Sequence, residues 1–219
     1  MLIAVLGTGM VGRAIAGRLL EVGHDVVMGT RDPDATRGRD DDTSAWLADH
    51  ADVELASFSE VGGDAEVVIN ASNGLAALDI LAQVGSAALA GKVLVDISNP
   101  LDFSGGFPPT LAVKDTDSLG EQIQRAYPDT FVVKTLNTMN ASVMADPGRL
   151  GEPSTVFVSG DDADAKAVVT ELLESLGHTD VLDLGGLETA RGAEMYVALW
   201  IRTWQSLGTL DFNIKVVRG

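Results

Sequence analysis

Short apolar runs alternate with longer amphipathic stretches along most of the chain. Residues 2–6 are apolar at every position, which is typical of a strand buried on both faces. Met10 to Val22 then carries apolar residues at helical spacing, and Gly23 follows as a helix-terminating glycine. The same alternation predicts strands at residues 25–28, 53–56, 66–70, 92–97 and 130–135, and helices at 44–50 (capped by Thr43 or Ser44), 57–61, 75–89, 118–126 and 141–144.

A smaller unit of the same kind follows residue 150. The pattern predicts strands at 154–159 and 178–184 and helices at 162–176 and 187–207. Residues 195–201 are apolar on every side of the last helix, so we expect it to be buried inside the protein or against a second subunit. Strands alternating with helices predict an α/β fold with a doubly wound, Rossmann-type, mostly parallel sheet and a small C-terminal βαβ-plus-helix unit.

Two segments are predicted to be loops. Residues 31–42 are charged and contain Pro33 and Gly38. Residues 99–117 contain Pro100, Pro108 and Pro109, and a loop of this length in a compact domain is often functional.

Composition excludes several classes of function. The chain has 219 residues with 32 Asp and Glu against 15 Lys and Arg, a formal charge of -17, which disfavours nucleic acid or an anionic membrane as partner. It has no cysteine, which excludes disulfides, thiolate metal sites and a cysteine nucleophile, and we assign no metal site. No apolar run reaches the ~20 residues of a membrane span. With no basic leader, a cytoplasmic protein is expected.

The first strand is followed directly by the spacing G-x-G-x-x-G. Gly7 permits a tight turn, Gly9 lets the backbone approach a pyrophosphate, and Gly12 lets the following helix pack closely on the strand. Backbone amides of this loop, including those of Thr8, Met10 and Val11, would face the phosphates. The alternative is a glycine-rich turn with packing duties only. We therefore expect a dinucleotide-binding domain over residues 1–150, and a C-terminal unit over residues 151–219 that contributes an acceptor pocket, a dimer interface or both.

The end of the second predicted strand indicates which dinucleotide binds. A carboxylate there would bind the 2′-hydroxyl of NAD, but this chain has Gly29, Thr30 and Arg31. A hydroxyl and a guanidinium suit a 2′-phosphate, so the sequence predicts NADP, with Arg37 as a further cation. The alternative is that Arg31 only pairs with a neighbouring aspartate.

Three further strand ends carry small amides and hydroxyls, at residues 70–74, 97–100 and 135–140. Ligands of open parallel sheets bind beyond the carboxyl ends of the strands, so these segments could hold a ribose or carboxamide. Ordinary turn and cap chemistry is the alternative. The candidate cofactor-binding residues here are Ala71, Ser72, Asn73, Ser98, Asn99, Pro100 and Asn137.

Residues 4–9, 29–31, 132–138 and 184–188 together resemble NADPH-dependent oxidoreductases of the coenzyme F420 type, along nearly the whole chain. Residues 94–100 and the 132–138 segment also resemble the cytosolic oxidoreductase domain of six-transmembrane metalloreductases. The resemblance implies hydride exchange between NADP and a 5-deazaflavin, with Thr8, Thr30 and Arg31 at the 2′-phosphate. It places the deazaflavin ring near Asn137 and Met139. Several family members carry histidine where this chain has Asn137.

Hydride transfer between two stacked rings needs positioning and exclusion of water rather than a protein nucleophile. We therefore assign no catalytic residue, although Lys134 is a candidate proton donor whose alternative role is pairing with a carboxylate. Trp200, with Trp204 and Tyr196, could line an acceptor pocket, form a dimer interface or pack in the core.

The expected partners are a small-molecule electron acceptor and a second copy of the chain. The leading acceptor is coenzyme F420. The alternatives are an NADPH-dependent reductase of a flavin, a quinone or a small imine, and an NADP-binding sensor without turnover.

Overall fold

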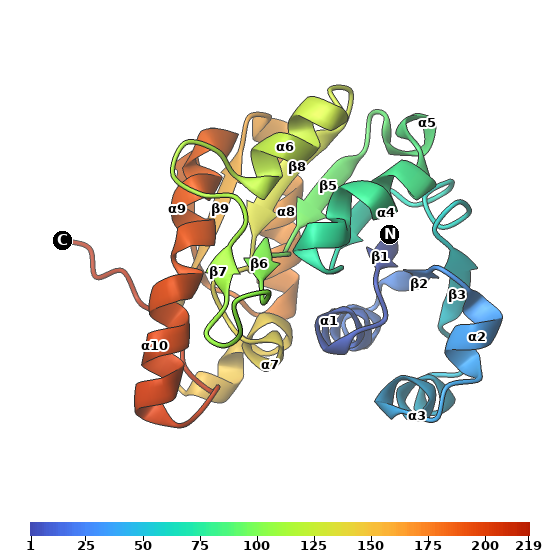
Figure 1. The fold of residues 1–219 in the computed structure, drawn as a ribbon, viewed down its shortest axis with the longest axis horizontal. Coiled ribbons are helices and arrows are strands. Elements are labelled where there is room, and N and C mark those ends of the chain that lie inside the picture. Colours follow the sequence, from blue (N-terminus) through green and yellow to red (C-terminus); the bar gives the residue numbers. More distant parts are fainter.

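The structure is a computed structural model that describes all 219 residues. One sheet contains eight strands: β1 (Leu2–Leu6), β2 (Asp25–Thr30), β3 (Glu54–Ser57), β4 (Val67–Asn70), β5 (Val93–Asp96), β8 (Phe131–Thr135), β9 (Thr155–Gly160) and β10 (Asp180–Gly185). Their order is β10-β9-β8-β5-β4-β1-β2-β3 (Figure 1), and only β8 and β9 are antiparallel neighbours. The predicted doubly wound, mostly parallel sheet is therefore confirmed.

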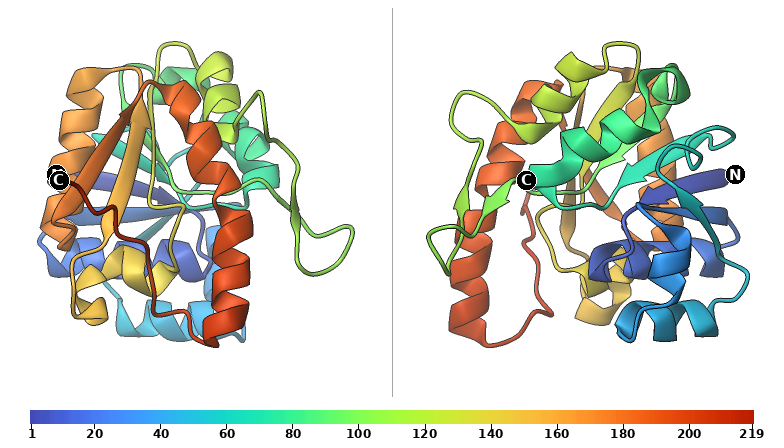
Figure 2. Two further views of the ribbon diagram at one scale, coloured as in Figure 1. Left: turned by 90° about the vertical axis from the view of Figure 1, so that its left-hand side faces the viewer. Right: turned by 45° about the vertical axis from the view of Figure 1, so that its right-hand side comes forward.

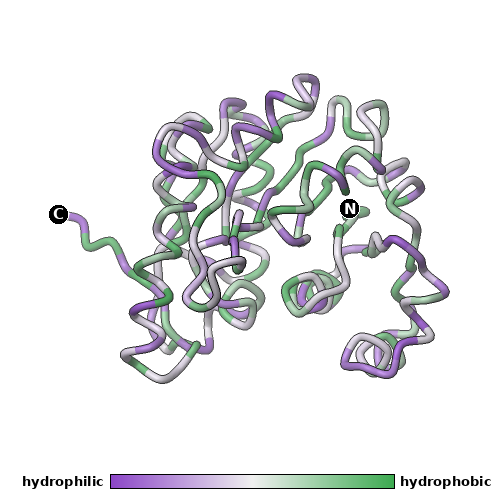
Figure 3. The backbone as a smooth tube through the Cα atoms, viewed as in Figure 1, coloured by the Kyte–Doolittle hydropathy of each residue, from purple (hydrophilic) through white to green (hydrophobic).

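Helices cover both faces of this sheet because the central strands are apolar at successive positions. Along β1, Ile3 and Val5 contribute to one core cluster, and Ala4 and Leu6 contribute to the other. The first cluster is completed by α1 (Met10–Glu21), α7 (Ala141–Ala145) and α8 (Ala163–Leu176). The second is completed by α4 (Ala77–Val84) and α6 (Leu119–Ala126). Figure 3 shows the hydrophobic colouring of the inner strand β5.

The order in which strands are added to the sheet reverses at β1, although β1 is parallel to both of its neighbours. From β1 the chain first builds β2 and β3 on one side, and then returns to build β4, β5 and β8 on the other. Ligands of open α/β sheets bind beyond the carboxyl ends of the strands at such a reversal. The glycine loop that follows β1 therefore lies at the expected ligand-binding edge.

The predicted loop at residues 31–42 is wrong because it contains a helix, α2 (Pro33–Arg37). Pro33 occupies the first turn, where its missing N–H costs nothing, and the Asp32 side chain accepts a hydrogen bond from the Ala35 amide at 2.9 Å. The next helix, α3 (Asp42–Asp49), is capped by Asp41 rather than by Thr43 or Ser44.

The helix predicted at residues 57–61 is also wrong. The amides of Glu60 and Val61 both bond to the Ser57 carbonyl, which makes a single turn that is not continued into a helix. Gly62 and Gly63 follow directly and disfavour helix propagation.

The predicted helix at residues 75–89 is divided into three pieces. A 3-10 turn, η1 (Gly74–Ala76), precedes α4, and α5 (Ser86–Leu89) follows it. The break falls at Gly85, whose φ of 89° lies outside helical geometry.

The predicted loop at residues 99–117 contains a small antiparallel pair, β6 (Leu101–Asp102) and β7 (Thr110–Leu111). The segment between these two strands extends away from the body of the molecule (Figure 2).

The C-terminal part continues the same sheet. A 3-10 turn, η2 (Pro147–Leu150), leads to β9, α8 and β10, and η3 (Leu187–Thr189), α9 (Ala190–Met195) and α10 (Val197–Leu207) follow. The division at residue 150 stays a prediction. Within the 195–201 segment Val197 and Ile201 are buried but Leu199 is 60% exposed, so burial inside this one chain is wrong and cover by a second subunit stays a prediction. None of the helices has both the length and the apolar character that crossing a membrane requires.

Candidate functional site

A cavity of about 370 Å³ lies at the carboxyl edge of the sheet. It is bounded by the start of α1, by the segments after β4, β5 and β8, and by α10. Eleven of its 18 lining residues are hydrophobic, and none carries a formal charge. The lining residues are Met10, Val11, Ala71, Ser72, Asn73, Gly74, Ile97, Ser98, Asn99, Leu101, Phe103, Asn137, Met139, Asn140, Ala141, Met144, Val197 and Trp200.

The structure brings most of the predicted rim residues together around this cavity. Of the predicted rim set only Pro100 is absent from the lining. Sequence reasoning missed Leu101, Phe103, Ala141, Met144 and Val197, because apolar residues in a loop or short helix carry no signal that distinguishes a ligand wall from core packing.

The glycine loop has the geometry that a diphosphate requires. Gly7 adopts a φ of 111°, and its amide donates to the Gly29 carbonyl at 2.9 Å. A Cβ on Gly12 would lie 2.0 Å from the Gly7 carbonyl oxygen, so only glycine permits this packing of α1 on the loop. A Cβ on Gly9 would meet nothing within 4 Å, and no side chain caps α1. The open space over uncapped amides fits a phosphate group.

Arg13, which the sequence reasoning missed, holds the glycine loop in place through two hydrogen bonds. Its Nη1 donates to the Thr8 carbonyl at 2.9 Å and to the Thr43 hydroxyl at 2.8 Å. These bonds join the glycine loop to the start of α3. A basic residue directly after the third glycine was the available signal.

The side chains predicted to bind the 2′-phosphate differ in whether they already have partners within the protein. Arg31 is exposed and makes no ion pair, so the alternative of pairing with Asp32 or Asp34 does not occur. Arg37 is likewise exposed, at the end of α2. The buried Thr30 hydroxyl lies 2.8 Å from that of Thr36. Thr36 donates to a backbone carbonyl, so Thr30 donates to Thr36 and would have to exchange that bond for one to a phosphate.

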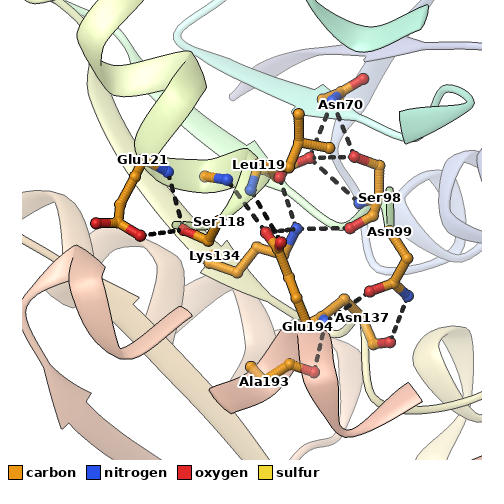
Figure 4. Close-up of polar contacts among 12 residues, drawn as sticks. Asn70, Ser98, Asn99, Ser118, Leu119, Glu121, Lys134, Asn137, Ala193 and Glu194 are labelled. Carbon is orange, nitrogen blue, oxygen red and sulfur yellow. Dashed lines mark hydrogen bonds and ion pairs between the residues drawn. The ribbon is translucent and has the colours of Figure 1, made fainter. Parts of the chain in front are cut away.

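Lys134 lies beneath the cavity, not in its wall, and is 1% exposed. Its Nζ lies 2.7 Å from Asp96 Oδ2, 2.6 Å from the Ser98 carbonyl oxygen and 2.9 Å from Glu194 Oε1 (Figure 4). Burial alone would lower the pKa of Lys134, but the charges of Asp96 and Glu194 outweigh it and raise the pKa. All three N–H groups of the ammonium are occupied, so the pairing role predicted for Lys134 is present and no proton faces the cavity.

Buried hydrogen bonds tie the rim segments to this ion pair. Asp96 Oδ1 accepts from the Ser98 hydroxyl at 2.7 Å and from Asn70 Nδ2 at 2.9 Å. Asn99 and Asn137 bond reciprocally, because Asn137 Nδ2 donates to Asn99 Oδ1 at 2.9 Å and Asn99 Nδ2 donates to the Asn137 carbonyl at 2.8 Å. The ends of β4, β5 and β8 thus form one polar network.

On α10 the cavity wall is formed by Val197 and Trp200, and this part is called the aromatic wall. Trp200 lines it and stacks on Phe212 with ring centroids 5.4 Å apart. Trp204 lies behind Trp200 at 6.1 Å and contacts Phe107 edge-on at 5.9 Å. Of the three aromatic residues predicted on this helix, only Trp200 reaches the cavity.

Three comparisons with known proteins point to the same family. A family model described as coenzyme F420-dependent NADP oxidoreductase matches residues 2–100. The F420-dependent NADP reductase of Methanothermobacter marburgensis is 32% identical over 207 residues, covering 92% of this chain and 91% of that protein. A solved structure from Arthrobacter sp. FB24, provisionally described as an F420-dependent NADP reductase, is 59% identical with a TM-score of 0.96, covering 99% of each chain.

Two more distant likenesses involve longer proteins. Metalloreductase STEAP3 of Rattus norvegicus is 28% identical over 93% of this chain, but the chain spans only 38% of its length. The imine reductase of Streptomyces aurantiacus is 20% identical with a TM-score of 0.66, over 94% of this chain and 63% of that one, which shows a shared fold.

Proposed function

Since the chain belongs to the F420-dependent NADP oxidoreductase family, we propose that it transfers a hydride between NADP(H) and the deazaflavin coenzyme F420. The family is one of NADP-dependent oxidoreductases. The observation that supports the specific transfer is the single cavity that runs from the glycine loop to the aromatic wall on α10. Such a cavity could hold two flat rings face to face.

The N-terminal half of the chain would bind and orient the dinucleotide. The amides of the loop from Gly7 to Gly12 would accept the pyrophosphate. Thr8, Thr30 and Arg31, with Arg37 nearby, would surround the 2′-phosphate. The bound nicotinamide ring supplies or accepts the hydride. The cofactor-contacting residues on the rim would be Ala71, Ser72, Asn73, Ser98 and Asn99, whereas the predicted Pro100 is buried outside the cavity lining.

The remaining walls would hold the second ring in place. Met139, Val197 and Trp200 present apolar surface that keeps water from the reacting atoms. Asn137 donates both amide hydrogens within the protein, to Asn99 and to the Ala193 carbonyl, so its side chain shapes the rim rather than offering a donor to the ring. The role of the chain is therefore to orient the rings and exclude water.

A panel of acceptors tests the proposal. Purified protein and NADPH are mixed in turn with oxidised F420, a flavin, a quinone and a small imine, and the loss of nicotinamide absorbance is followed. Turnover with F420 is expected. Turnover only with another acceptor would replace F420 by that acceptor, and tight NADPH binding without any turnover would favour the sensor.

A further inference from the structure

The rim of the cavity and the C-terminal helices meet at one buried ammonium group. Lys134 on β8 contacts Asp96 and the Ser98 carbonyl, which belong to the rim, and Glu194, which belongs to α9. All three charged side chains are at most 1% exposed. Figure 4 shows the Lys134 and Glu194 side chains meeting close to Ser98.

Glu194 fixes α9 in a second way. Its Oε2 accepts from the Leu119 amide at 2.9 Å, and its Oε1 accepts from the Gly120 amide at 3.1 Å, both at the start of α6. Free amides at a helix start stabilise a carboxylate, so the Glu194 charge is compensated from two directions. The preceding residue, Ala193, accepts from Asn137 Nδ2 at 3.0 Å. Residues 193–194 are therefore bonded both to Lys134 and to the Asn99–Asn137 pair.

The helical segment held in this way leads directly to the aromatic wall. Val197 and Trp200 lie three and six residues after Glu194, and both line the cavity. Ser98 and Asn99, which belong to the predicted dinucleotide rim, line the same cavity. The Lys134–Glu194 pair therefore connects this rim with the segment that carries Val197 and Trp200.

We propose that Lys134 and Glu194 are positioning residues whose buried ion pair sets the separation between the rim at Ser98–Asn99 and the wall at Val197–Trp200, and with it the distance that a hydride must cross. The inference rests on the proposed function, because it concerns the geometry of that same cavity. Neither residue touches the cavity, so each acts only through the segments it holds.

Stability alone gives a weak reason for such a cluster. Burying charged groups carries a desolvation cost, and well-packed apolar side chains often stabilise a fold as well or better. The directional contacts of an ammonium with three fixed acceptors hold the surrounding segments in one arrangement. A displacement of about 1 Å in the reacting groups can reduce a rate about 100-fold, so fixed spacing has a large functional effect.

Two substitutions at Glu194 separate charge from reach. Glu194→Gln keeps the size of the side chain but removes the charge. Glu194→Asp keeps the charge but is one methylene shorter, so it is not expected to contact Lys134 and the α6 amides together. Arg191→Gln is the matched control, because Arg191 Nε bonds to Glu121 Oε2 at 2.8 Å and joins the same two helices without touching the Lys134 network.

The measurements include one that does not depend on turnover. In a Trp46→Phe, Trp204→Phe background, Trp200 is the only tryptophan, and its emission maximum and acrylamide quenching without nucleotide report how closely the α10 wall is packed on the cavity. Both Glu194 variants are expected to shift this emission and increase the quenching, and to lower kcat about 10- to 100-fold, with the Kd for NADPH within about twofold of the parent. Arg191→Gln should match the parent in all three.

A neutral triple variant, Asp96→Asn with Lys134→Met and Glu194→Gln, leaves no charge buried without a partner and is expected to fold. It should show the same changes, so the test remains decisive if a single variant fails to fold. Parent-like Trp200 fluorescence and kcat in any folded variant that lacks the pair would overturn the inference. Absence of turnover in the parent with every acceptor would instead refute the proposed function, while the Trp200 fluorescence would still test the positioning role.

Discussion

Gly9 and Gly12 are both glycines of the phosphate loop, but replacing each by alanine should affect a different property. Gly9→Ala should weaken NADPH binding, and Gly12→Ala should lower the stability of the fold. A Cβ on Gly9 meets nothing within 4 Å, and the residue has a φ of -71°, which alanine adopts without strain. Gly9→Ala should therefore change the free energy of unfolding by no more than about 0.5 kcal/mol. The new methyl group would stand in the space that a phosphate needs.

The expected loss of affinity follows from the hydrogen bonds that the methyl group would block. Each bond from a backbone amide to a charged group contributes about 1.5–3 kcal/mol, so loss of one bond weakens binding about 10- to 100-fold. Gly12→Ala behaves differently, because its Cβ would lie 2.0 Å from the Gly7 carbonyl oxygen and backbone must move. Overpacking of this kind costs about 1–3 kcal/mol or more, so the free energy of unfolding should fall before any ligand is added.

The assay compares two quantities for each variant. Chemical denaturation without ligand gives the free energy of unfolding, and titration with NADPH gives the Kd. The refuting result is a Gly9→Ala protein that folds normally and binds NADPH like the parent, because the dinucleotide then does not lie over the loop. A Gly12→Ala protein with parent stability would refute the close packing of α1 on Gly7.

Three further predictions concern other parts of the molecule. Arg31→Ala should weaken NADP binding at least about 10-fold while leaving NAD binding nearly unchanged, and equal losses for the two would contradict the phosphate role. A hydrogen bond from Arg125 lowers the pKa of Asp117 to about 2, so this pair should stabilise the fold above pH 3.8 and lose its effect as the pH falls towards 2. Asp117→Asn should lower the free energy of unfolding by about 1 kcal/mol near neutral pH after solvent screening. The same loss at pH 2 would contradict this. Burial lowers the pKa of His178 below 6.5, so the unfolded chain binds the proton more readily and the free energy of unfolding should fall as the pH drops below 6.5. His178→Asn should weaken this pH dependence of stability, measured by denaturation between pH 5 and 7. An unchanged pH dependence would exclude His178 as its source.

Features encoded by neighbouring residues were predicted well from the sequence. The apolar run at residues 2–6, the glycine spacing after it and the end of the second strand identify the sheet and the predicted nucleotide edge, because each depends on local geometry. Errors occurred where a short element depends on its cap. Asp32 and Pro33 start α2 within a stretch whose charge suggested a loop, and Gly85 divides a helix whose apolar pattern is continuous.

The buried network could not be predicted because it depends on contacts between distant parts of the chain. Glu194 is one acidic residue among many, and only the folded structure places it 2.9 Å from Lys134, which lies 60 residues earlier. Asn137 was predicted from its position at a strand end, but its hydrogen bonds to Asn99 and Ala193 depend on how β5, β8 and α9 pack.

Direct transfer between two rings held in one cavity is tested by following the hydride itself. NADPH labelled with deuterium on one or the other face of nicotinamide C4 is mixed with the protein and oxidised F420, and the reduced deazaflavin is analysed by mass spectrometry. We expect deuterium to reach the deazaflavin from only one of the two labelled forms, because the cavity holds the rings in one relative orientation. Reduced deazaflavin without label from either form, or no reduction by a protein that binds NADPH tightly, would contradict direct transfer at this site.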